Sequence, residues 1–93
     1  MNRDEAKAIL SRELGAYRKR QYSELLYLLQ SQDTKEVIAV TGKKYQLEFQ
    51  AVLDDSINED LRVIGAIDDL GFRAFAPLTE DFNITTEGKF VGE

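Results

Sequence analysis

The stretch Leu61-Arg-Val-Ile-Gly-Ala-Ile-Asp-Asp-Leu-Gly-Phe-Arg-Ala-Phe-Ala-Pro77 decides the fold that we expect for this chain. Two runs rich in Val, Ile and Phe flank a short polar link at residues 68–71, where Gly71 can supply the positive φ that a tight turn requires. The pattern predicts a β-hairpin. Because an isolated hairpin is barely stable in water, further strands and an apolar covering layer must lie beside it.

The residues upstream of this hairpin predict two more strands. Between Tyr45 and Leu53, apolar residues alternate with polar ones, which is typical of an antiparallel strand with one buried and one solvent-exposed face. Residues 36–41 are mostly β-branched and short enough to form a strand, and Gly42-Lys43 predicts the turn between the two strands.

The residues downstream carry fewer strand signals. Pro77 has no backbone N–H, so the second strand of the predicted hairpin ends there or runs along a sheet edge. Residues 79–93 contain a few large apolar side chains among turn formers, with Gly88 at the centre of a predicted turn. Two alternatives stay open for this segment: a fragment of strand, or a tail held by its aromatic residues.

The N-terminal third predicts the covering layer. Asn2 is placed to cap a helix, with Glu5 as the capping-box residue, and apolar residues then recur at helical spacing up to Tyr17. The basic run at residues 18–20 interrupts this spacing and is typical of a solvated helix end or bend. The apolar residues at 22–29 fit either one continuous helix or a second short helix after a break.

These elements together predict one α+β domain over residues 1–93. A helix, either continuous or broken into two, packs on a four-stranded antiparallel meander sheet to form two layers. This order resembles the cystatin-like arrangement, in which a sheet curls around one helix. A resemblance of this kind implies a fold and carries no activity with it.

The composition excludes several classes of function. The chain has no Cys and no His, which removes thiolate nucleophiles, cysteine-type zinc sites and the usual general base. A net charge of −5 argues against a nucleic-acid partner, and no stretch approaches the ~20 apolar residues of a membrane span. We therefore expect no enzyme activity, no cofactor and no metal. The charged N-terminus and the absence of Cys favour a cytoplasmic protein.

The charge is unevenly distributed along the chain. Residues 1–44 contain nine Lys or Arg and six Asp or Glu, whereas residues 45–93 contain three and eleven. One interpretation is a basic helical layer that attracts an acidic sheet or keeps the protein soluble. The other is an acidic surface that binds a basic protein.

The acidic loop after residue 53 invites comparison with a calcium site. An EF-hand loop that began at Asp54 would need Gly at its sixth position and Glu at its twelfth. The chain has Glu59 and Gly65 at these positions, so the motif fails and a solvated loop is favoured.

Two pairs of aspartates are candidate binding residues. Asp68 and Asp69 occupy the tip of the predicted hairpin, and we expect Asp54 and Asp55 at the same end of the sheet. Two carboxylates about 5–9 Å apart can act as general acid and base in glycoside hydrolysis. Turns also select Asp because its side chain bonds the local backbone, and this interpretation is the simpler one.

Two arginines in the predicted hairpin form a second candidate. If the strands pair symmetrically about the turn, Arg62 and Arg73 lie at the same level of the sheet. They could form a small anion-binding site, or pair with Glu48 across the ladder.

Three segments carry a resemblance to known sequences: Arg73-Ala-Phe-Ala-Pro-Leu-Thr-Glu-Asp-Phe82, Tyr45-Gln-Leu-Glu48 and Leu61-Arg-Val-Ile64. They resemble small bacterial proteins of uncharacterised function. The resemblance implies a compact intracellular domain, and it assigns no functional residue.

The function that the sequence favours is a small protein-interaction module, such as an inhibitor, an immunity-type protein or an adaptor. Its partner would be a basic protein, and the chain would be a monomer or a weak homodimer. The alternative is a small-molecule-binding domain with its ligand between the helix and the curled sheet. The candidate binding residues are Asp54, Asp55, Arg62, Asp68, Asp69 and Arg73.

Overall fold

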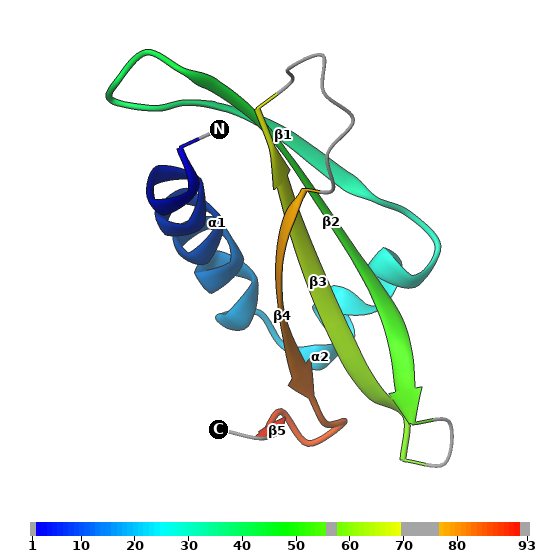
Figure 1. Cartoon of the computed structure of the whole chain (residues 1–93). Helices are drawn as coiled ribbons and strands as arrows, with labels where there is room; N and C mark the ends of the chain where they lie inside the picture. The colour runs from blue at the N-terminus through cyan, green and yellow to red at the C-terminus, as the bar shows by residue number, and fades with distance from the viewer. Residues whose placement is uncertain (1, 56–57, 70–76, 92–93) are drawn as a thin grey trace.

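The computed structural model describes residues 2–55, 58–69 and 77–91. Its elements in chain order are α1 (Arg3–Arg18), α2 (Tyr22–Leu25), the 3-10 helix η1 (Leu26–Leu29), β1 (Asp33–Ile38), β2 (Lys44–Asp55), β3 (Asp60–Asp68), β4 (Leu78–Ile84) and β5 (Phe90–Val91). The strands form one antiparallel sheet in sequence order, and α1 lies along one face of it (Figure 1). The predicted α+β class and antiparallel sheet are confirmed.

The sheet has five strands where we expected four. The additional strand, β5, contains two residues and pairs with the end of β4 through Asn83↔Val91 and Ile84↔Phe90. A strand this short shows no alternation, so the sequence left open a fragment of strand or a tail over residues 79–93; the strand alternative is confirmed.

The hairpin predicted over residues 61–77 is confirmed only in its first strand. Its first strand exists as β3, but the neighbours of β3 are β2 on one side and β4 on the other. The pairing runs from Leu61↔Ile84 to Ile67↔Leu78, so the strand after Pro77, rather than the one predicted before it, completes the hairpin. Residues 70–76, which carry the predicted turn and second strand, lie outside the described residues.

Two hairpin turns share one geometry, in which glycine is required. At the β1–β2 turn the Gly42 N–H donates to the Ala39 carbonyl and the Ala39 N–H donates to the Lys43 carbonyl, both at 2.8 Å. Gly42 has φ +89°, and Gly88 repeats this at the β4–β5 turn with φ +85°. A three-residue hairpin loop places its third residue in the left-handed region, where only glycine is unstrained.

The first helix begins as predicted at Asn2, whose side-chain oxygen accepts a hydrogen bond of 3.1 Å from the Glu5 N–H. The Glu5 carboxylate, expected to complete a capping box, instead accepts hydrogen bonds from Tyr45 Oη at 2.8 Å and Thr41 Oγ1 at 2.9 Å. These bonds join the start of α1 to the β1–β2 hairpin. Burial and the bond to Glu5 raise the pKa of Tyr45 to about 12.

The helical region is broken, which decides between the two alternatives left open by the sequence. Residues 19–21 separate α1 from α2, and the Gln21 N–H donates to Glu24 Oε1 at 2.8 Å to start the second helix. The change of direction brings Leu25 and Leu28 into the core, where each is at most 1% exposed.

The core fills the space between the helical layer and the inner face of the sheet. It contains Ala6, Ile9, Leu10, Leu14, Tyr17, Leu25, Leu28, Tyr45, Leu47, Phe49, Ala51, Leu61, Val63, Ile67, Phe82 and Ile84. The packing is closest at Gly65, where a Cβ atom would lie 2.9 Å from Phe49 Cε1 and 3.0 Å from Leu10 Cδ1. The absence of a side chain at Gly65 therefore lets α1 approach the sheet.

The alternation predicted for β2 is confirmed over residues 45–51. The buried residues of the inner face are Tyr45, Leu47, Phe49 and Ala51. Leu53 keeps this alternation, because it pairs with the buried Leu61, but its expected burial is wrong, since it is 46% exposed. The strand register shifts only beyond it, between Leu53 and Asp55.

The assignment of the two faces of β2 can be tested with adjacent substitutions. Phe49 is 1% exposed and its ring centroid lies 4.4 Å from that of Tyr17, whereas Gln50 is exposed. Phe49→Ala should lower the free energy of unfolding by about 3–5 kcal/mol, and Gln50→Ala by less than about 0.5 kcal/mol. Denaturant titration measures both, and equal losses would contradict the assignment.

Candidate functional site

The sheet face opposite α1 is a broad surface that no described helix covers (Figure 1). We call it the outer face. Strand alternation and register place on it Thr34, Glu36, Ile38, Lys44, Gln46, Glu48, Gln50, Val52, Asp54, Arg62, Ile64, Ala66, Asp68, Thr79, Asp81 and Asn83. These residues carry five negative and two positive charges, a formal net charge of −3.

One end of the outer face holds a compact polar cluster around Arg62. Its guanidinium contacts Asp54 at 2.8 Å and Asp81 at 3.4 Å, and the Asn83 side-chain amide donates to Asp54 Oδ2 at 2.6 Å. Arg62 is therefore neutralised by neighbouring carboxylates. The pairing of Arg62 with Glu48, which we had considered, is wrong, because Glu48 lies opposite Ala66, four positions along β3.

The two pairs of aspartates lie at opposite ends of the sheet, which contradicts the expectation that they share one end. Asp55 pairs with Asp60 at one end of β3, and Asp68 pairs with Gln46 at the other. The nine residues of β3 span about 30 Å, so these carboxylates cannot act together. Successive connections of an antiparallel meander alternate between the two ends of the sheet, which explains the error.

The remaining predicted binding residues have separate surroundings. Asp69 forms an ion pair of 3.5 Å with Lys43 and so joins the end of β3 to the β1–β2 hairpin. Arg73 lies outside the described residues, so its expected position beside Arg62 is not described.

Asp68 instead lies in a small depression on the outer face together with Glu48. Glu48 was not among the predicted binding residues. Gln46, Glu48, Ala66, Asp68 and Pro77 line this depression, which has a volume of about 100 Å³. Glu48 lies opposite Ala66, which makes Asp68 its diagonal neighbour across the β2–β3 ladder. We call this depression the acidic notch. It is the size of one inserted side chain and much smaller than the roughly 300–1,000 Å³ of a small-molecule pocket.

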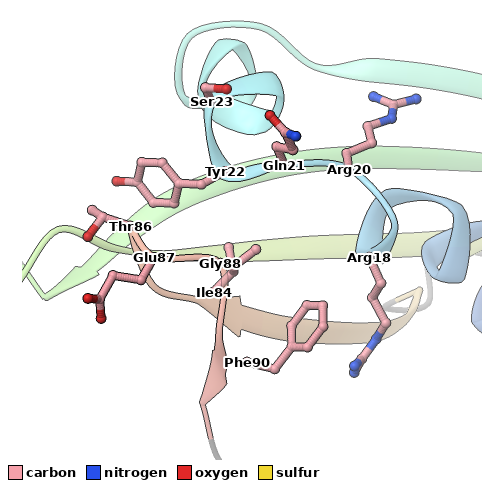
Figure 2. A pocket seen from close by; sticks show the side chains of 10 residues that line it. All are labelled: Arg18, Arg20, Gln21, Tyr22, Ser23, Ile84, Thr86, Glu87, Gly88 and Phe90. Atoms are coloured by element: carbon pink, nitrogen blue, oxygen red, sulfur yellow. The ribbon is translucent and has the colours of Figure 1, made fainter.

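A second and larger pocket, of about 450 Å³, lies where the break between α1 and α2 meets the β4–β5 hairpin. We call it the end pocket, and Figure 2 shows its lining. The lining residues are Arg18, Arg20, Gln21, Tyr22, Ser23, Ile84, Thr86, Glu87, Gly88 and Phe90. The sequence does not link the basic run with the Gly88 turn, because only the folded chain brings together residues some 65 positions apart.

Beside the end pocket, a hydrogen-bonded network joins the end of α1 to the start of β1. The hydroxyl groups of Tyr17 and Tyr27 donate to Asp33 Oδ2 at 2.6 and 2.5 Å, and Arg20 Nη1 donates to the Tyr27 hydroxyl at 2.9 Å. The Arg20 guanidinium also lies over the Tyr17 ring, 4.3 Å from its centroid. This network holds the helix break in place against the sheet.

The network shifts the pKa values of Asp33 and Tyr17. Partial burial alone would raise the pKa of Asp33, but the bonds from Tyr17 and Tyr27 and the charge of Arg20 outweigh it and lower that pKa. Burial, followed by the bond to Asp33, raises the pKa of Tyr17 well above its ordinary value. The arrangement therefore favours an ionised Asp33 between two neutral tyrosines.

Across the described ranges 2–55, 58–69 and 77–91, no group of three or more acidic side chains is arranged to hold a metal ion. Within the same ranges, no helix combines the length and apolar character of a membrane span.

Comparison with protein-family models, with curated proteins and with solved structures finds no match for this chain. The function is therefore inferred from the chemistry of the outer face.

The lowered pKa of Asp33 predicts a pH-dependent contribution to stability. An ionised Asp33 stabilises the fold at pH values above its ordinary pKa of 3.8, and this stabilisation is lost as the pH falls through the lower pKa of the folded state. Asp33→Asn should therefore lower the free energy of unfolding by about 1–3 kcal/mol at neutral pH. The difference from the unsubstituted protein should shrink below about pH 4.

Urea titrations between pH 7 and pH 2.5 measure this difference. Glu36→Gln is the matched control on the same strand, because Glu36 is exposed and its side chain forms, among the described residues, one ion pair of 3.8 Å with Lys44. A loss for Asp33→Asn that stayed constant over this pH range would contradict the role given to the Asp33 charge.

Proposed function

We propose that this chain is a small protein-interaction module whose outer face binds a basic protein. The observation that carries the proposal is the acidic notch, in which Glu48 and Asp68 flank a depression of side-chain size on an uncovered, negatively charged sheet. A lysine or arginine of the partner would extend its alkyl chain over Ala66 and place its charged group between the two carboxylates.

The outer face also carries exposed apolar side chains. These favour a protein partner over nonspecific binding of small cations. The aliphatic side chains of Ile38 and Val52 are 68% and 43% exposed, and Ile64 lies between the charged positions of β3. Protein interfaces combine apolar contact with a polar rim, and charge complementarity then provides orientation and fast association.

The Arg62 cluster limits where the partner's charges can bind. Asp54 and Asp81 already contact Arg62, so a second cation gains little from them. Glu36 likewise lies near Lys44. Among the described residues Glu48 forms no ion pair, so of these carboxylates it attracts the partner's cation most strongly.

A module of this kind would act as an inhibitor, an immunity-type protein or an adaptor in the cytoplasm, as a monomer or a weak homodimer. The helix-first order that resembles the cystatin-like arrangement does not enter the proposal, because a fold carries no function by itself. The alternative of a ligand between helix and sheet has no support, since Leu10 and Phe49 approach Gly65 closely and fill that space.

The proposal is tested with the substitution pair Glu48→Gln and Asp68→Asn, which removes two charges and preserves side-chain shape. Its control pair is Asp4→Asn and Glu59→Gln, two exposed positions off the outer face with the same change in net charge. The probe is oligolysine, titrated into the protein by calorimetry at about 50 mM and about 500 mM salt.

We expect the notch pair to weaken oligolysine binding roughly three- to tenfold at low salt and the control pair by less than about twofold. High salt should weaken binding to the unsubstituted protein strongly. Equal losses for the two pairs would show a response to net charge alone and would overturn the assignment of the acidic notch.

A further inference from the structure

The edge of the sheet at β1 carries backbone groups that no described residue uses. Among the described strands only β2 pairs with β1. At the β1–β2 turn the Ala39 N–H donates to the Lys43 carbonyl, so the bonding groups of Ala39 point toward β2. Because these groups alternate in direction along a strand, the N–H and C=O groups of Thr34, Glu36 and Ile38 point away from β2. They can pair with a further strand.

The side chains of these three residues all lie on the outer face. Each of them is exposed, Ile38 by 68%. The sequence of β1 contains no proline, so every residue keeps its N–H group. A strand that pairs antiparallel with β1 would form its hydrogen-bonded pairs at Thr34, Glu36 and Ile38, and its opposing side chains would lie beside theirs. A partner segment bound in this way extends the outer face.

A shallow depression leads from this edge toward the acidic notch. Its volume is about 220 Å³, and it is lined by Thr34, Lys35, Glu36 and Gln46. Gln46 also lines the acidic notch, so the two depressions adjoin. Thr34 lies directly opposite Glu48 in the register of β1 with β2. A row across the outer face therefore runs from the free edge, over the small side chain of Thr34, to the Glu48 carboxylate.

This carboxylate decides the charge of the residue that fits the row. Glu48 is exposed and forms no ion pair with any described residue. An added strand would lie about 10 Å from β2, which is two strand spacings. A lysine or arginine opposite Thr34 can lay its alkyl stem over the threonine and place its charge at Glu48. The carboxylate has two oxygens, so this contact is compatible with a cation in the acidic notch.

The other two positions of the edge require no cation. Glu36 already forms an ion pair of 3.8 Å with Lys44, so a charge opposite it gains little. Ile38 leaves most of its side chain in water, and an aliphatic residue opposite it would bury part of that surface. The edge therefore favours an aliphatic residue near one end and a cation near the other.

We propose that the basic partner binds by adding an extended segment to β1 as an antiparallel strand. A lysine or arginine of the segment lies opposite Thr34, and an aliphatic residue lies opposite Ile38, four positions earlier in the segment. Every described strand pair of this sheet is antiparallel, and the antiparallel ladder is slightly the more stable one. The inference rests on the proposed function, because Glu48 belongs to the acidic notch. It adds the conformation of the partner and the spacing of two of its residues.

The probe is the peptide acetyl-Thr-Val-Thr-Gln-Thr-Lys-Thr-amide, titrated into the full chain while the backbone amide signals are followed by two-dimensional NMR. In the proposed register its Val lies opposite Ile38, its Gln opposite Glu36 and its Lys opposite Thr34. The amide signals of these three residues should shift and saturate below about 5 mM peptide. The absence of saturable shifts at these residues would overturn the proposal.

Two N-methylated forms of the peptide separate strand pairing from attraction between charges. In the proposed register the N–H of the central Gln points toward β1, whereas the N–H of the Thr after it points to solvent. Methylation of the Gln nitrogen should weaken binding at least roughly tenfold, and methylation of the Thr nitrogen by less than about twofold. Equal losses would overturn the addition of a strand, while the oligolysine titration still decides the proposed function by itself.

The substitution Glu48→Gln tests the position of the cation. It should weaken binding of the peptide roughly threefold at about 50 mM salt, and it should not change binding of a peptide with Gln in place of Lys. Glu59→Gln is the control, because Glu59 is exposed, lies off the outer face and loses the same charge. Equal effects of the two substitutions would contradict the contact with Glu48 and the register that it defines.

A second copy of the chain is the competing occupant of this edge. In the protein alone, the outward amides of Thr34, Glu36 and Ile38 should exchange rapidly with solvent, and the peptide should slow them. Slow exchange of these amides in a dimer of the chain alone would assign the edge to a second copy and would overturn the proposal.

Discussion

The structure depends on the contact between the apolar side of α1 and the inner face of the sheet. Tyr17 and Phe49 pack their rings at 4.4 Å, and the missing side chain at Gly65 allows Leu10 to reach the same level of the sheet. Because a sheet with one apolar face must bury it against another layer, this contact keeps all the long strands on one side of a single core. It also leaves the opposite face of the sheet open to a partner.

The hydrogen bonds around this core place the ends of the helical layer. Glu5 binds the β1–β2 hairpin at one end of α1, and Asp33 binds two tyrosines near the other. These polar contacts lie at the edge of the core, where water can still reach them in part. They fix the helix break and thereby shape the end pocket, although none of them belongs to its floor.

The sequence predicted those parts of the fold that follow from local patterns. The alternation from Tyr45 to Ala51 and the cap at Asn2 each depend on neighbouring residues, and both are confirmed. β4 stayed undecided between a fragment of strand and a tail, because its polar run at residues 79–81 is typical of a loop. The sequence did not decide whether the helix breaks after Arg18, because one continuous helix and two short helices both place the apolar residues on one side.

The candidate sites were predicted less well, for a topological reason. Glu48 and Asp68 meet only because β2 and β3 pair in one particular register, and no spacing along the chain reveals it. The end pocket likewise joins the Arg18 region to the Phe90 region across most of the chain. The expectation for Asp54 and Asp68 failed because it ignored the alternating ends of a meander.

The free edge of β1 has a consequence for self-association. Among the described strands β1 pairs only with β2, so its outer hydrogen-bonding groups are available to another strand. When two copies of a strand pair antiparallel about a perpendicular two-fold axis, the residue on the axis faces its own copy. At the middle of β1 that residue is Lys35 or Glu36, and either choice sets like charges directly opposite each other. Charge at the centre of this edge thus discourages the chain from extending its sheet with a second copy of itself.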